Sequence, residues 1–86
     1  MMKEFSKNEF SKEIKRIRLR LSCSQAEFCK RLHISSGTYS AWETGRFLPS
    51  VSSFKEVCGK LKEMKVPDVG IRSLKQKYYD LKVRDK

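Results

Sequence analysis

The chain of 86 residues contains no long uncharged apolar segment, which excludes a membrane-spanning helix. Such a helix needs about 20 consecutive apolar residues. The longest uncharged run here, residues 34–42, is about half Ser, Gly and Thr. The opening segment MMKEFSKNEF also lacks the apolar block of a secretory signal. We therefore expect a cytoplasmic protein with no membrane partner.

Residue types for metal or covalent chemistry are also scarce. There is one His, and the three Cys residues (Cys23, Cys29 and Cys58) form no CxxC pair, so a disulfide framework is not expected. Cys29 and His33 are four residues apart, but two ligands do not complete a four-coordinate zinc site. No Gly-rich phosphate loop or nucleophile elbow occurs. We predict no enzymatic activity, no metal and no cofactor, and we interpret the thiols as small buried side chains.

Positive charge is abundant. Lys and Arg number 20 against 10 Asp and Glu, which gives a net charge of +10 and a pI near 9.8. Both the N-terminal and the C-terminal quarter of the chain carry part of the surplus, so it is not confined to one tail. A basic protein of this kind suits a polyanion, with nucleic acid as the first choice and an anionic membrane surface as the second.

The sequence predicts helices separated by capping signals, and no segment alternates at period two for long enough to form a strand. The segment SKNE at 6–9 has the form of a capping box, in which Ser and Glu each accept from the other's backbone N–H. Apolar residues then recur at spacings of four, three and four: Phe10, Ile14, Ile17 and Leu21. This pattern predicts a first helix over residues 6–21.

Two short helices are predicted next. A second capping box, SQAE at 24–27, begins a helix over residues 24–32. A further Ser cap begins a third helix over 35–44, and Gly45 ends it. Because only residues 33–34 separate these two helices, we expect them to cross at a steep angle.

Two longer helices complete the predicted fold. Ser50 is expected to cap a fourth helix, whose inward stripe is Val51, Phe54, Val57, Cys58 and Leu61. The segment VPD at 66–68 breaks the chain, and Asp68 is expected to cap a fifth helix, within the C-terminal segment 66–86. Its apolar residues fall on one face: Ile71, Leu74, Tyr78 and Leu81. The sequence therefore predicts one all-α, five-helix domain over residues 1–86.

Residues 24–50, SQAEFCKRLHISSGTYSAWETGRFLPS, carry a recognisable pattern. It begins with Ser-Gln, an acidic, a large apolar and a small residue, here Ser24, Gln25, Glu27, Phe28 and Cys29. A Leu, an aliphatic turn residue and a Ser follow, here Leu32, Ile34 and Ser35. The last part is Thr38, Tyr39, Trp42, Glu43, Gly45, Arg46, Pro49 and Ser50. The pattern resembles the lambda-repressor-like (XRE-type, Cro/repressor) helix-turn-helix family over a motif core of about residues 10–61.

Three features depart from that family's pattern. His33 stands where the family usually has Gly, at a turn position that favours φ > 0 and costs a residue other than Gly about 1 kcal/mol. Cys29 replaces a small Ala at the crossing of two helices. The outward face of the 35–44 helix has none of the Gln, Asn or Arg side chains that read bases bidentately.

The resemblance implies that the 35–44 helix lies in the major groove of DNA. The residues it assigns to DNA binding are Ser24, Gln25, Ser35, Ser36, Gly37, Thr38, Ser40, Ala41, Thr44 and Arg46. Gln25 and Arg46 are expected at phosphates, and the helix face at base edges. Arg18 and Glu43 match the family's structural ion pair. A charged Glu43 beside Trp42 is costly unless it is paired.

These features predict a sequence-specific regulator of transcription that binds double-stranded DNA, a homodimeric repressor associated with the nucleoid. A dimer is expected because one recognition helix reads few base pairs. We assign the face of the fifth helix to dimerisation (Ile71, Leu74, Tyr78 and Leu81), with packing on the first helix as the alternative. The rival hypothesis is an antitoxin-like interaction protein that holds a protein partner with this helix. A basic module for RNA or anionic membranes comes third.

Overall fold

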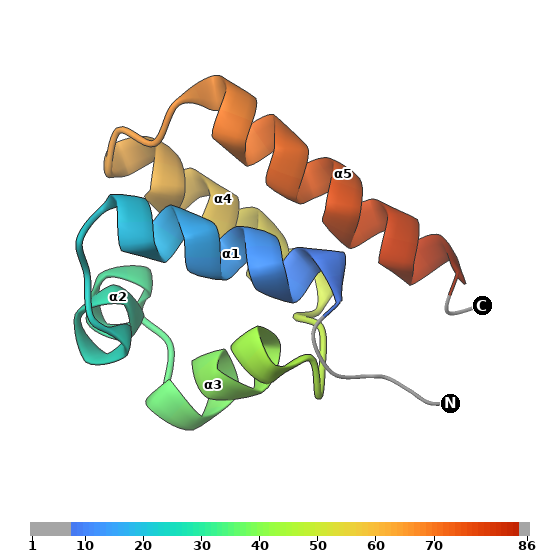
Figure 1. The fold of residues 1–86 in the computed structure, drawn as a ribbon, viewed down its shortest axis with the longest axis horizontal. Helices are drawn as coiled ribbons and strands as arrows, with labels where there is room; N and C mark the ends of the chain where they lie inside the picture. The colour runs from blue at the N-terminus through green and yellow to red at the C-terminus, as the bar shows by residue number, and fades with distance from the viewer. Residues whose placement is uncertain (1–7, 85–86) are drawn as a thin grey trace.

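The computed structural model of the protein describes residues 8–84, and this part of the chain contains five α-helices and no strand. The helices are α1 (Glu9–Arg20), α2 (Gln25–Leu32), α3 (Ser36–Thr44), α4 (Val51–Glu63) and α5 (Asp68–Arg84). As Figure 1 shows, α1 lies at the centre, with α3 on one side of it and α5 on the other. The predicted all-α class is confirmed.

The first helix begins later than its pattern predicted. Asn8 is the N-cap, and its side-chain oxygen accepts a hydrogen bond from the Ser11 N–H at 2.7 Å. The predicted capping box at Ser6 lies outside the described residues. Asn is as good an N-cap as Ser, so residues 6–9 contained two caps that sequence alone could not rank.

The capping signals of the next two helices predicted their start points. Ser24 and Glu27 form the reciprocal capping box at the start of α2. Ser35 caps α3 by accepting from the N–H of Thr38 at 3.2 Å. Between the two helices, His33 adopts the left-handed conformation, with φ 61° and ψ 44°. In Figure 1, α2 and α3 cross steeply, as the short connection predicted.

Replacing His33 with Gly is expected to leave the free energy of unfolding unchanged or to raise it by up to about 1 kcal/mol. Gly adopts this backbone conformation without steric cost, although its greater freedom in the unfolded chain offsets part of the gain. His33→Ala is the matched control. Ala cannot adopt the left-handed conformation without steric cost, so this variant should lower the free energy of unfolding. Urea unfolding of both variants measures the difference. A clear loss in His33→Gly would mean that the imidazole itself stabilises the fold.

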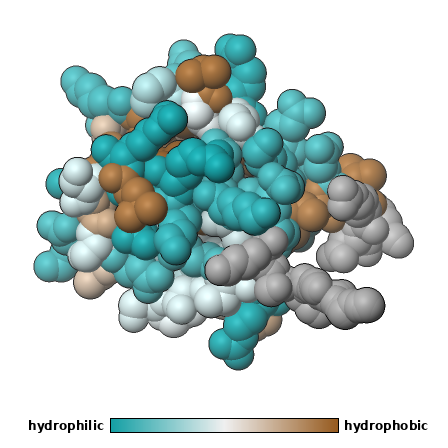
Figure 2. Space-filling view, viewed as in Figure 1, coloured by the Kyte–Doolittle hydropathy of each residue, from teal (hydrophilic) through white to brown (hydrophobic). Residues whose placement is uncertain are grey.

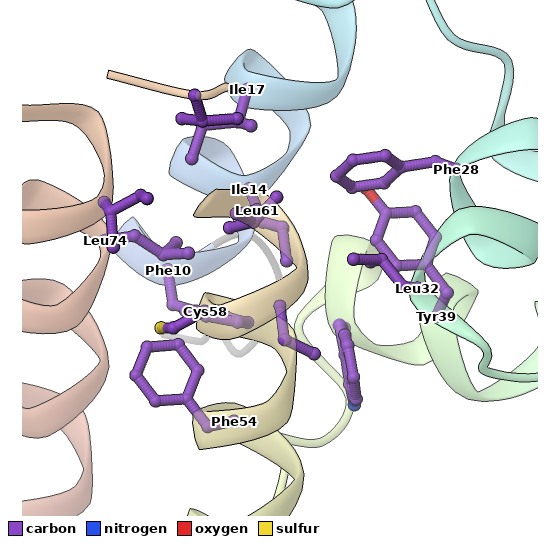
Figure 3. Packing of buried hydrophobic residues seen from close by; sticks show 14 of the residues in the cluster. Phe10, Ile14, Ile17, Phe28, Leu32, Tyr39, Phe54, Cys58, Leu61 and Leu74 are labelled. Atoms are coloured by element: carbon purple, nitrogen blue, oxygen red, sulfur yellow. The ribbon is translucent and has the colours of Figure 1, made fainter. Parts of the chain in front are cut away.

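One continuous core connects all five helices. Aromatic residues dominate it: Phe54 stacks on Tyr78 at 3.9 Å between ring centroids, and Phe28 meets Tyr39 edge-on at 5.4 Å. Figure 3 shows Phe10 and Leu74 meeting between α1 and α5, with Phe28 and Tyr39 on the side of α2 and α3. The thiols of the three cysteines are buried and unpaired, as the sequence indicated.

The structure corrects two predictions about α4 and α5. Val51 was placed on the inward stripe of the fourth helix, but 44% of it is exposed, because it occupies the first helical position after the Ser50 cap. Asp68 is in the first turn of α5 and does not cap it. Instead, the carbonyl oxygen of Pro67 accepts from the N–H groups of Gly70 and Ile71.

The assignment of the α5 face to dimerisation is also corrected. Ile71, Leu74 and Tyr78 are buried inside the chain, where α5 packs on α1 and α4. The hydroxyl of Tyr78 donates to the carbonyl oxygen of Pro49 at 2.6 Å. Leu81 is half-buried against the same core. The first four helices leave an apolar surface over Phe10 and Phe54 that α5 covers, so these four residues serve the fold of one chain.

Candidate nucleic-acid interface

Helix α3 has one face in the core and one face in solvent. Tyr39 and Trp42 are buried and hold the helix on the rest of the domain. The polar face consists of Ser36, Gly37, Thr38, Ser40 and Thr44, and all but the half-buried Ser40 are exposed. A Cβ atom at Gly37 would meet nothing within 4 Å, so the space beside this turn is open. The exposed N-terminal half of α3 can therefore approach the edges of bases in a groove.

Ala41 does not belong to this outward face, contrary to the prediction. Only 4% of its surface is exposed. After Gly45, which ends α3 in the left-handed conformation (φ 83°), the chain turns back. The N–H groups of Arg46 and Phe47 then donate to the carbonyl oxygen of Ala41 at 2.9 and 3.5 Å. These bonds close the C-terminal turn of α3, and the buried Ala41 side chain is not part of the outward face.

At the start of α3, the side chains of Ser35 and Thr38 use part of their hydrogen-bonding capacity on each other. The hydroxyl of Ser35 donates to that of Thr38 at 2.8 Å, while Ser35 also caps the helix. At the other end, the hydroxyl of Thr44 donates to the carbonyl oxygens of Ser40 and Ala41. Ser36 is therefore the exposed α3 hydroxyl with no partner within the described residues.

A buried carboxylate fixes the position of α3. Arg18 of α1 donates from Nε to Glu43 Oε2 at 2.7 Å and from Nη2 to Oε1 at 3.4 Å. The Tyr39 hydroxyl donates to Oε2, and Gln25 Nε2 donates to Oε1 at 2.9 Å. Arg18 also donates from Nη1 to the carbonyl oxygen of Cys23 at 2.9 Å. This cluster, which we call the Glu43 cluster (Arg18, Gln25, Tyr39 and Glu43), joins α1, α2 and α3.

The electrostatics of the cluster keep Glu43 charged. Burial opposes its ionisation, but the hydrogen bonds from Arg18, Tyr39 and Gln25 outweigh it, so the pKa of Glu43 lies below its ordinary value. The hydrogen bond with Glu43 raises the pKa of Arg18. Burial and the bond to Glu43 raise the pKa of Tyr39, which stays protonated and remains a donor. The cluster is a charged, fully hydrogen-bonded joint at neutral pH.

Gln25 thus has a second role that its sequence position did not reveal. It is predicted at a phosphate, and its side-chain amide donates to Glu43 while the residue stays exposed. The capping box uses the N–H of Glu27, which leaves the N–H groups of Gln25 and Ala26 in the exposed first turn of α2. Those groups, together with the positive end of the helix dipole, can bind a phosphate.

The loop after α3 borders the same surface. Arg46 is exposed and forms no ion pair within the described part of the chain, as a phosphate contact requires. Phe47 beside it is 62% exposed, a feature that the sequence did not reveal because no local pattern marks an exposed aromatic residue in a loop.

Ser11 is a second residue that the sequence did not reveal. It lies on α1 and is 1% exposed, and its hydroxyl donates to the carbonyl oxygen of Trp42 at 2.7 Å. It therefore gives α1 a second contact with the end of α3, two turns before Arg18.

The described residues include no group of three or more His, Cys, Asp or Glu side chains that could hold a metal ion. None of the helices described is long and apolar enough to cross a membrane. Burial raises the pKa of the thiols of Cys29 and Cys58, which disfavours the reactive thiolate.

Helices α2 and α3 are short and are joined by a tight left-handed turn. The second of them has an exposed polar face and is held by the buried Glu43 cluster. This arrangement is a helix-turn-helix. A model of the helix-turn-helix family matches residues 14–63. The chain belongs to this family, in its lambda-repressor-like (XRE) form, and is a DNA-binding helix-turn-helix protein. A search of curated proteins finds no match.

Proposed function

We propose that the protein is a sequence-specific regulator of transcription that inserts α3 into the major groove of double-stranded DNA. The observation that carries this proposal is the exposed face of α3, held rigidly by the buried Glu43 cluster. A base-reading element must be fixed in position before it meets DNA, because a loose element loses discrimination. The class of protein and this geometry support the same orientation of α3.

The short side chains on the exposed face of α3 suit base recognition, whereas most of the affinity has to come from phosphate contacts elsewhere. Ser36 and its neighbours are short, so they form single hydrogen bonds to base edges and cannot form the bidentate pairs that long amides or Arg provide. Contacts to phosphate from Arg46 and from the first turn of α2 would then supply much of the affinity. This division predicts modest discrimination at each base pair.

Selection of binding sites from random duplex DNA tests the proposal. Arg46→Ala should weaken binding to all duplexes and reduce the salt slope by about 1, whereas Ser36→Ala should change the preference among sequences. Arg31→Ala is the matched control, because its guanidinium reaches the sulfur of Met64, the C-cap of α4, and not the exposed face of α3. Equal affinity of the wild type for selected and scrambled duplexes at moderate salt contradicts sequence-specific binding.

A homodimeric repressor is the form of regulator that we propose. Two copies of α3 read more base pairs than one, and occupancy of a promoter excludes polymerase. With the inward face of α5 in the core, three of the exposed apolar residues lie at the start of α4 and in the C-terminal half of α5: Val51 (44% exposed), Tyr79 (40%) and Val83 (69%). Tyr79 contacts Phe54 edge-on at 5.8 Å, which places these residues at one end of the domain. Sedimentation of the wild type, free and with its selected duplex, measures the stoichiometry.

The same apolar end also supports the second candidate, a regulator that binds a different protein there. Co-purification with a heterologous partner, lost in Tyr79→Glu, would favour that function. Self-association lost in the same variant would favour the homodimer.

A further inference from the structure

The positive charge of the protein does not lie on its helix-turn-helix. Residues 24–45 contain two bases, Lys30 and Arg31, and two acids, Glu27 and Glu43. This segment is therefore neutral, although the whole chain carries +10. The cations that would attract a polyanion at long range are on the other helices, and Figure 2 shows a largely hydrophilic face with isolated apolar patches.

A basic groove lies between α4 and α5. Its volume is about 420 Å³, and four exposed cations border it: Lys55, Lys62, Arg72 and Lys75. None of the four forms an ion pair within residues 8–83, where the ion pairs are Arg16–Glu13 and Arg18–Glu43. Asp68 at one end is the single acid among the lining residues, so the groove keeps an excess of three positive charges.

The spacing of these cations suits a row of phosphates. Lys55 and Lys62 are two turns apart on α4, about 10 Å at 1.5 Å per residue. Arg72 and Lys75 are one turn apart on the opposite wall. Along one DNA strand the phosphates rise 3.4 Å each, so a wall of this length faces about three of them. The floor contains buried Cys58 and Ile71 and no aromatic side chain on which a base could stack.

The groove cannot reach the duplex that α3 contacts. Helix α3 packs on α1 and α2, whereas α5 packs on α1 and α4, and Figure 1 places α3 and α5 on opposite sides of α1. The molecule is at least 22 Å across in each direction. The screening length is about 8 Å at physiological salt, so charges on the far side contribute little to that first duplex.

We propose that the α4–α5 groove binds the phosphate backbone of a second DNA segment, so that one protein molecule joins two segments. This inference rests on the proposed DNA binding by α3. Lys side chains act as flexible point charges and Arg donates two parallel hydrogen bonds to a phosphate, so the second contact is independent of sequence. The protein would then have two DNA sites: the face of α3, which recognises bases, and the α4–α5 groove, which binds phosphates of any sequence.

A bridging assay tests the inference. A selected duplex is fixed to beads and saturated with the full chain, and capture of a labelled duplex of scrambled sequence is measured. The groove variant carries Gln at four positions: Lys55, Lys62, Arg72 and Lys75. The control variant loses four charges from exposed positions on α1 and α2: Lys12, Lys15, Arg20 and Lys30.

The groove variant is expected to lose capture of the second duplex at least 10-fold and to lower the salt slope of capture by about 3 to 4. Its affinity for the selected duplex should stay within about threefold of the wild type, while the control variant still captures. Equal loss in both variants, or capture by the groove variant at the wild-type level, overturns the inference and leaves the proposed function intact. Failure of the wild type to bind any single duplex overturns both.

Discussion

Replacing Glu43 with Ala is expected to lower the free energy of unfolding by about 3–5 kcal/mol, the range for breaking a buried ion pair. The side chains of Arg18 and Glu43 are only 10% and 5% exposed, so the guanidinium would stay buried without a counterion. The Tyr39 hydroxyl and the Gln25 amide would lose their acceptor as well. A small domain has a stability near the low end of 5–15 kcal/mol, so thermal unfolding should show a large drop.

A double-mutant cycle measures how much of this loss comes from the interaction between Arg18 and Glu43 themselves. Arg18→Ala should also be strongly destabilising, and the double variant should lose less than the sum of the single losses. Arg16→Ala is the comparison. The Arg16 side chain is 56% exposed and that of its partner Glu13 is 9% exposed, so this pair is better solvated than Arg18–Glu43 and its loss should cost less. Additive losses in the Arg18 and Glu43 cycle would show that the two charges do not stabilise each other.

The loss of stability in Glu43→Ala should become smaller as the pH falls. The pKa of Glu43 is lower in the folded protein than its ordinary value of about 4.3. Its contribution is therefore complete above that value and declines as the pH falls through the lower folded pKa. Urea unfolding of wild type and Glu43→Ala should differ most at neutral pH and converge in acid.

The parts of the fold that the sequence predicted depend on local chemistry. Caps at Ser24, Ser35 and Ser50 and the C-cap at Gly45 each use a side chain or backbone conformation within four residues, so they can be recognised without tertiary information. The left-handed conformation at His33 was expected from the family resemblance, which places Gly at this turn position. The contact of Arg18 with Glu43, 25 residues apart, needed the family resemblance, because no local rule joins such residues.

The predictions that failed depended on the way distant segments pack. Ala41 has a spacing that places it outward on an isolated helix, and it is buried in the packed domain. A contact that the sequence did not reveal has the same origin, because the Gln25 amide donates to a carboxylate that comes from another helix. An apolar stripe such as that of α5 shows that a partner exists, and only the packed structure shows that the partner is α1 and α4.

Replacing Leu74 with Glu is expected to prevent folding. Leu74 is fully buried between α5 and α1, close to Phe10 in Figure 3, and no cation lines this part of the core. Truncation of a buried Leu to Ala alone costs about 2–5 kcal/mol. A carboxylate adds the cost of burying a charge or its protonated form without a hydrogen-bonding partner. The free energy of unfolding of so small a domain is only a few times the loss expected for Leu74→Ala. The larger loss in Leu74→Glu should therefore unfold the domain, and circular dichroism should show the loss of helix.

Val83→Glu is the matched control for Leu74→Glu, because it places the same charge on the same helix at a side chain that is 69% exposed. This variant should keep its helical content and its melting temperature, and it should self-associate more weakly than the wild type if the apolar end of α5 forms the dimer. Leu74→Ala, measured in urea, gives the size of the core contribution where the Glu variant does not fold. If Leu74→Glu instead gave a folded monomer with wild-type stability, the stripe of α5 would face a second chain and the intrachain packing described above would be wrong.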